Sequence, residues 1–68
     1  MRYAVVIEKS ENGFAAYVPD LPGCIAAAKD LTETEKLIRE AIEFHLEGMR
    51  QHGELIPEPS AVAEYVNV

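Results

Sequence analysis

One stretch, Asp30 to His52, constrains the fold of this 68-residue chain more than any other. Its apolar residues recur at spacings of three, four and seven, which predicts a single stripe along an α-helix. The stripe consists of Leu31, Leu37, Ile38, Ala41, Ile42, His45, Leu46 and Met49. Asp30 and Glu33 have the spacing of a capping box, and Gly53 follows where a helix commonly stops. About 21 residues at 1.5 Å rise make a helix of about 31 Å, and its apolar stripe needs a partner surface.

Three short apolar segments before the helix are predicted to be strands, over residues 2–8, 14–18 and 24–28. Between the first two lies Asn12-Gly13, a pair that tolerates the positive φ angles of a tight hairpin turn. The run Pro19-Asp20-Leu21-Pro22-Gly23 then predicts a rigid, extended elbow with Leu21 held out at the bend.

After the helix, residues 54–60 read as a proline-containing connector and residues 61–68 as a last strand, with Val62, Val66 and Val68 on one face. The predicted fold class is therefore α+β with the order β-β-β-α-β. A right-handed crossover would place the last strand beside the first, in a four-stranded mixed sheet of order 3-2-1-4. The helix would cover one sheet face, and residues 1–68 would form a single domain.

The other sheet face would carry apolar side chains with nothing in the chain to cover them. We therefore expect a homodimer or a higher homo-oligomer, because small domains often gain stability by assembly. The candidate interface residues are Ala4, Val6, Tyr3 and Tyr17. The two tyrosines have a second interpretation, in which they stack on each other across the hairpin.

Charge and composition narrow the class of partner. Twelve acidic and six scattered basic residues give a net charge of −6, which argues against direct nucleic-acid binding and favours a basic protein partner. No apolar run approaches the roughly 20 residues that a membrane helix needs. The single cysteine, Cys24, suits a reducing compartment, so we expect a cytoplasmic protein.

The sequence does not predict a catalytic, cofactor or metal site. Glu40, Glu43 and Glu47 lie on the polar side of the helix and are best interpreted as solvated charges. Glu43 and Glu47 do not converge with His52 on a metal ion, and His52 is expected to cap the helix end. Cys24 starts an apolar strand, which favours a buried small hydrophobe over a nucleophile. His45, at the edge of the stripe, is expected to pack or to lie in an interface rather than to catalyse.

Several motifs resemble the HicB family of type II toxin–antitoxin proteins, found in bacteria and archaea. They are Tyr3-Ala4-Val5-Val6-Ile7-Glu8, Asn12-Gly13-Phe14, Val18-Pro19-Asp20-Leu21-Pro22-Gly23-Cys24, Glu40-Ala41-Ile42 and Ile56-Pro57-Glu58-Pro59-Ser60. The resemblance implies a fragment of the ribonuclease-H fold without its catalytic carboxylates. It also implies a non-enzymatic antitoxin that binds and neutralises HicA, a small basic toxin that cleaves mRNA.

Many family members carry a DNA-binding segment after this domain, whereas this sequence ends at Val68, so we expect no direct binding to DNA. The candidate partner-binding residues are Asp20, Leu21, Glu40, Glu43 and Glu47. Asp20 has two interpretations, since it either hydrogen-bonds its own turn or is presented to the partner. The alternative function is a solitary, oligomeric HicB-like binding protein with no toxin partner.

Overall fold

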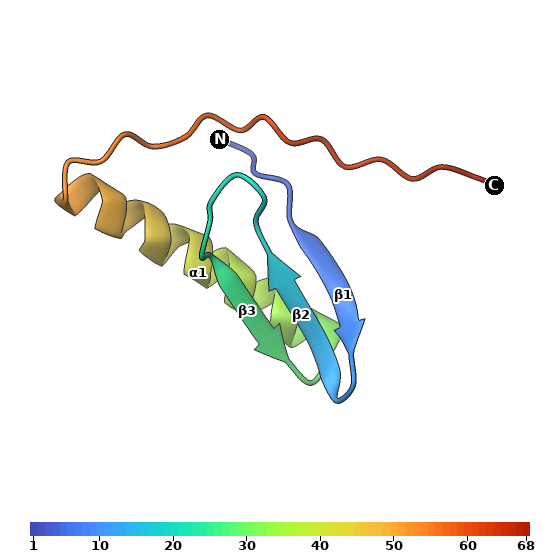
Figure 1. Ribbon diagram of the computed structural model, residues 1–68. Coiled ribbons are helices and arrows are strands. Elements are labelled where there is room, and N and C mark those ends of the chain that lie inside the picture. The colour runs from blue at the N-terminus through green and yellow to red at the C-terminus, as the bar shows by residue number, and fades with distance from the viewer.

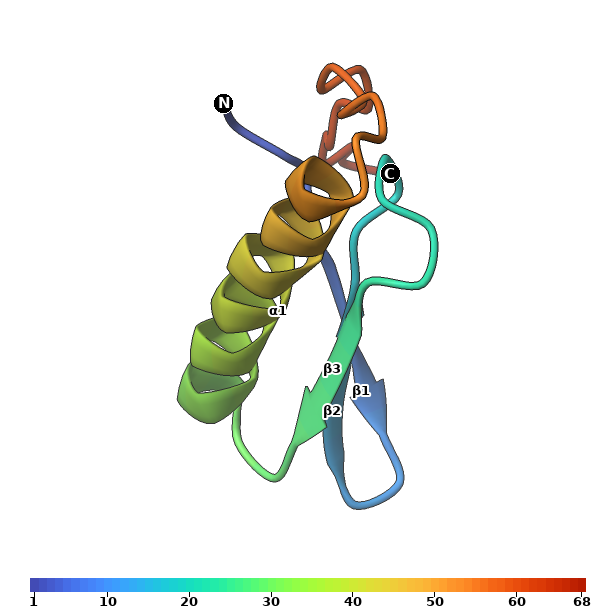
Figure 2. The same cartoon turned by 90° about the vertical axis from the view of Figure 1, so that its left-hand side faces the viewer.

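A computed structural model describes residues 1–68 and shows a three-stranded sheet with one helix packed on one face (Figures 1 and 2). The elements are β1 (Val6–Ser10), β2 (Gly13–Tyr17), β3 (Ile25–Ala28) and α1 (Leu31–Gln51). The sheet is antiparallel throughout, with the order β1-β2-β3. The predicted meander and helix are therefore confirmed, while the four-stranded mixed sheet is wrong.

The C-terminal residues do not form the predicted fourth strand. Residues 61–68 pair with no strand, and in Figure 1 they run extended across the end of the sheet beside the N-terminus. The reason lies at Ser60 and Ala61, whose backbone N–H groups donate to Asp20 at 3.0 and 3.1 Å. These bonds direct the chain across the end of β1 rather than along its edge.

The first hairpin is confirmed, but it is shorter than predicted. Val6 pairs with Tyr17 and Ser10 with Gly13, so Glu11 and Asn12 form the turn. β2 ends at Tyr17, which leaves residues 2–5 without a strand opposite them. The turn contains no positive φ angle. Gly13 is required for another reason, since a Cβ there would collide with the carbonyl oxygen of Ala28.

The helix begins and ends with the predicted caps. The Asp30 carboxylate accepts a hydrogen bond from the backbone N–H of Glu33 at 2.7 Å, and His52 Nδ1 lies 2.7 Å from the Gly48 carbonyl oxygen. The stripe differs in its first turn, where Leu31 is partly exposed and Thr34 is fully buried. Thr34 Oγ1 donates to the Asp30 carbonyl oxygen at 2.8 Å, and this bond satisfies the hydroxyl inside the core.

The core lies between α1 and the sheet and contains few residues. Its fully buried apolar members are Ala16, Val18, Leu21, Cys24 and Ile38. α1 contacts β2 and β3 but not β1, so one edge of the sheet extends beyond the helix. The molecule is therefore thin, with dimensions of 40 × 28 × 15 Å.

The elbow after β2 is a compact, hydrogen-bonded turn rather than an extended segment. The N–H of Leu21 donates to the Val18 carbonyl at 3.0 Å, and the N–H of Cys24 donates to the Leu21 carbonyl at 3.1 Å. Gly23 has a φ of +85°, a conformation that favours glycine. The turn directs Leu21 inward, where only 1% of it is exposed, so the expectation of an outward-facing Leu21 is wrong.

Candidate interaction surfaces

The polar side of α1 presents an acidic surface. Glu40, Glu43 and Glu47 are all exposed, and only Glu47 has an ion-pair partner, Arg50, at 3.7 Å. An exposed pair of this kind contributes about 0–1 kcal/mol to stability, so these charges matter little for folding. Their negative field is available to a basic partner.

An exposed aromatic residue lies within this acidic surface and was missed in the sequence-based prediction. Phe44 is 83% exposed, although it is a large apolar side chain in the middle of a helix. Glu40 precedes it by four residues and Glu47 follows it by three, so all three share one helix face. The signal was present in the sequence as a phenylalanine interrupting the charged side of the amphipathic pattern.

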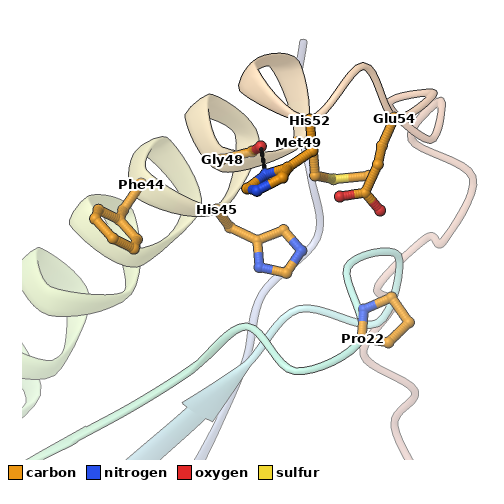
Figure 3. A pocket seen from close by; sticks show the side chains of 7 residues that line it. All are labelled: Pro22, Phe44, His45, Gly48, Met49, His52 and Glu54. Atoms are coloured by element: carbon orange, nitrogen blue, oxygen red, sulfur yellow. Dashed lines mark hydrogen bonds between the residues drawn. The ribbon is translucent and has the colours of Figure 1, made fainter.

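A shallow hollow of about 490 Å³ lies beside Phe44, between the C-terminal half of α1 and the elbow (Figure 3). It is lined by Pro22, Phe44, His45, Gly48, Met49, His52 and Glu54. His45 points into the hollow from α1, and Pro22 faces it from the elbow. The lining is mixed, since Phe44 and Met49 are apolar while His45, His52 and Glu54 are polar, and a mixed lining of this kind suits contact with a protein surface.

Asp20 lies at the base of the C-terminal segment and holds it in place. Its carboxylate accepts bonds from the N–H groups of Ser60 and Ala61 and from the Ser60 hydroxyl at 2.9 Å. These bonds, led by that from Ala61, lower the pKa of the Asp20 carboxyl group. The bonds go to residues about forty positions away in the chain rather than to the turn that contains Asp20.

Cys24 is buried in the core as expected, with 3% of it exposed. Burial raises the pKa of its thiol, because an apolar environment disfavours the thiolate. No three His, Cys, Asp or Glu side chains lie close enough together to hold a metal ion. The single helix is too polar to span a membrane.

The two tyrosines of the predicted interface lie on different sides of the sheet. Tyr3 packs against the core, and its hydroxyl donates to the Pro57 carbonyl oxygen at 2.6 Å. Tyr17 lies on the far face, level with its β1 partner Val6 and its β3 partner Ile25. The tyrosines therefore do not stack on each other. Ala4 and Val6 are partly buried, and the far face carries no covering element (Figure 2).

Comparison with known proteins gives consistent matches along the chain. A family model describing HicB-like antitoxins of bacterial toxin–antitoxin systems matches residues 3–68. The chain is 40% identical over 62 residues to a UPF0150 protein of Thermoplasma acidophilum, and the match covers 90% of both chains.

The chain is also 40% identical over 67 residues to an uncharacterised 14.9 kDa protein of Haemophilus phage HP1, covering 98% of this chain and 50% of that protein. It therefore spans about half the length of this relative. A solved structure, the HicA3 and HicB3 toxin–antitoxin complex, matches with a TM-score of 0.75 and 32% identity. That match covers 87% of this chain and 70% of the chain compared.

Proposed function

The chain belongs to the HicB-like antitoxin family, and we propose that it is a non-enzymatic interaction module that binds and neutralises a small basic HicA-type toxin. The observation that carries this proposal is the likeness to a solved toxin–antitoxin complex over 87% of the chain. The resemblance of its motifs to HicB proteins implies a toxin that cleaves mRNA. The protein would act in the cytoplasm, where its only thiol stays reduced.

Electrostatics support this class of partner. The net charge is −6, and the three helix carboxylates Glu40, Glu43 and Glu47 are exposed. A negative surface attracts a basic protein and raises the rate of association. Phe44, on the same face, adds an apolar anchor of the kind enriched at interface centres. We therefore centre the proposed toxin-binding surface on these four residues.

Asp20 and Leu21, the other two residues expected to bind the partner, have different places in the structure. The Asp20 carboxylate accepts hydrogen bonds from Ser60 and Ala61. In the proposed complex Asp20 therefore holds these two residues in place and adds a negative charge at the rim of the toxin-binding surface. Leu21 is buried in the core, and we leave it out of the proposed surface.

The experiment that tests the proposal is co-expression with a small basic HicA-type toxin. We expect the wild-type chain to restore growth and to co-purify with the toxin. The Phe44→Ala variant should do so less well, because truncation removes the apolar anchor. Leu55→Ala, which truncates another exposed apolar side chain, is the matched control and should behave as wild type. If the wild-type chain neither co-purifies nor restores growth, the antitoxin proposal is wrong.

A second candidate function is an oligomeric binding protein that acts without a toxin. The uncovered far face of the sheet, with Val6, Tyr17 and Ile25, is the observation that favours it. In either case we propose that the chain forms a homo-oligomer, because only 6 of its 68 residues are buried.

A further inference from the structure

The C-terminal segment, residues 62–68, has unusual exposure for an apolar stretch. Val62, Tyr65, Val66 and Val68 are each more than three-quarters exposed. No residue after Ala61 makes a hydrogen bond with the rest of the chain. In Figure 1 the segment continues past β1 and ends well away from the body of the molecule. Its backbone groups and apolar side chains are therefore available to another molecule.

The base of this segment is fixed, and that determines where it can reach. Asp20 holds Ser60 and Ala61, and Tyr3 holds the Pro57 carbonyl at 2.6 Å. To run along β1 of its own chain, the segment would have to turn sharply directly after Ala61. The sequence Val62-Ala63-Glu64-Tyr65 has none of the glycine, proline or asparagine residues that favour such a turn.

A complementary surface exists on the same chain, at the edge of β1. β1 pairs only with β2, so its outer edge has unpaired N–H and C=O groups, which readily accept another extended segment. An apolar groove of about 510 Å³ lies between α1 and residues 1–7, the segment that leads into β1. Its apolar lining comprises Met1, Tyr3, Val5, Ile7, Ile38 and Ile42.

The side chains of the C-terminal segment match this groove. In an extended conformation Val62, Val66 and Val68 share one face, and this face would cover the apolar floor. Glu64 lies on the same face, and the charged residues of the groove are one opposite charge, Arg39, and two like charges, Glu35 and Glu43. In the same extended conformation Tyr65 would project from the opposite side of the strand, toward the far face of the sheet, where Val6 and Tyr17 are partly exposed.

The exposed area of the chain is large enough to form an interface with a second molecule. A compact monomer of 7.5 kDa is expected to expose about 4,200 Å², whereas this chain exposes 5526 Å². The excess is of the order of 1,300 Å², compared with about 800 Å² per partner in a standard interface.

We propose that the C-terminal segment of one copy binds along the β1 edge and the adjacent groove of a second copy, and that the exchange is reciprocal. A two-fold axis relates the copies, so the same contact is made twice. The dimer is independent of any toxin, and the far sheet face is not its main contact.

The test combines mass by light scattering with hydrogen exchange on the full chain at micromolar concentration. The wild-type chain is expected to have about twice the monomer mass of 7.5 kDa and protected amides in residues 62–68. The Val62→Asp/Val66→Asp variant is expected to be a monomer without this protection. Its circular dichroism should be unchanged, because neither residue belongs to the core.

Leu55→Asp is the matched control, since Leu55 is highly exposed but lies outside the segment, and it should remain a dimer. Three results would overturn the proposal. A monomeric wild type with protected amides would place the segment in its own groove. A monomeric wild type without protection would leave the segment unbound. A dimer that survives Val62→Asp/Val66→Asp but dissociates with Ile25→Asp would assign the contact to the far face.

Discussion

At the scale of single residues, the fold depends most on positions where backbone approaches backbone. At Gly13 the start of β2 passes the end of β3, and a Cβ would lie 2.8 Å from Lys29 Cα as well as colliding with the Ala28 carbonyl. Both neighbours are main-chain atoms, at the last residue of β3 and directly after it, so they cannot move away as a flexible side chain would. A Cβ added at Gly48, in contrast, would meet no atom within 4 Å, so that position tolerates a side chain.

Replacing Gly13 with alanine is therefore expected to destabilise the protein by about 1–3 kcal/mol through overpacking. Gly48→Ala is the control and should be neutral or stabilising by up to about 1 kcal/mol, because alanine favours helix. Urea unfolding followed by circular dichroism measures both changes. A Gly13→Ala protein as stable as wild type would show that the close approach at Ala28 is not tight.

Asp20 is expected to make the stability of the protein depend on pH, and the direction of its pKa shift determines the sign of that dependence. Its folded-state pKa is lowered from the usual 3.8 by the bonds from Ala61 and Ser60. A lowered pKa contributes stability that is present above the unfolded pKa and is lost as the pH falls through the folded one. Asp20→Asn should therefore weaken the pH dependence of unfolding below about pH 4. Hydrogen exchange at Ser60 and Ala61 is a second measurement, and both amides should exchange faster in the variant.

If wild type and Asp20→Asn lose stability with the same slope on acidification, the carboxylate does not hold the segment. Glu58→Gln, a carboxyl change in the same connector, is the control and should leave both readouts unaltered. Comparing the two variants in both measurements separates a specific effect of Asp20 from a general loss of negative charge.

At the scale of elements, the helix is defined by its caps as much as by its stripe. The Asp30 carboxylate satisfies the N–H of Glu33, one of the helix-start donors that have no partner inside the helix. The carbonyl of Asp30 also accepts the Thr34 hydroxyl, which would otherwise be buried without a partner. Asp30 thus connects the capping of α1 to the core.

Asp30→Ala is expected to cost about 0.5–2 kcal/mol, the usual range for loss of an N-cap side chain. Asp30→Asn should retain most of the stability, because the amide oxygen can still accept the Glu33 N–H. Thermal unfolding of the two variants distinguishes the cap from a simple charge effect. Equal losses in both variants would show that charge, rather than the hydrogen bond, is what stabilises the helix start.

Sequence patterns predicted the elements whose information is local. The helix has its own stripe and caps, and the hairpin has a short turn between two apolar segments, so both were found, although the first strand is Val6–Ser10 rather than residues 2–8. Whether residues 61–68 form a strand beside β1 depends on the hydrogen bonds that Asp20 accepts from Ser60 and Ala61. These bonds join distant parts of the chain. Alternation of valines indicates a capacity to form a strand, but it does not show which strand edge is within reach.

The same distinction applies to the candidate surfaces. Glu40, Glu43 and Glu47 could be placed on an exposed side because helical periodicity determines it. Leu21 could not, since its burial comes from packing in the same core cluster as Ala16 and Ile38, which lie elsewhere in the chain. Phe44 was predictable in principle, as an aromatic residue among charges.

At the scale of the whole molecule, a thin two-layer domain with a net charge of −6 is suited to binding another protein. Its small core provides little stability to spare, whereas its surfaces are extensive and differ in character. The acidic face of α1 centres on Phe44, and the groove beside residues 1–7 begins at the edge of that face, where Glu43 lines it. The surfaces proposed for self-association and for toxin binding are therefore neighbours that meet at Glu43.

The most direct test of the proposed function is the association rate with a basic HicA-type toxin, measured for two charge-reversal variants. Glu43→Lys/Glu47→Lys changes the acidic helix face, while Glu8→Lys/Glu11→Lys makes the same change in net charge on the hairpin. At low salt we expect the helix variant to associate about tenfold or more slowly than the hairpin variant, and we expect this difference to shrink as salt screens the charges. Equal association rates for the two variants at low salt would contradict docking on the helix face.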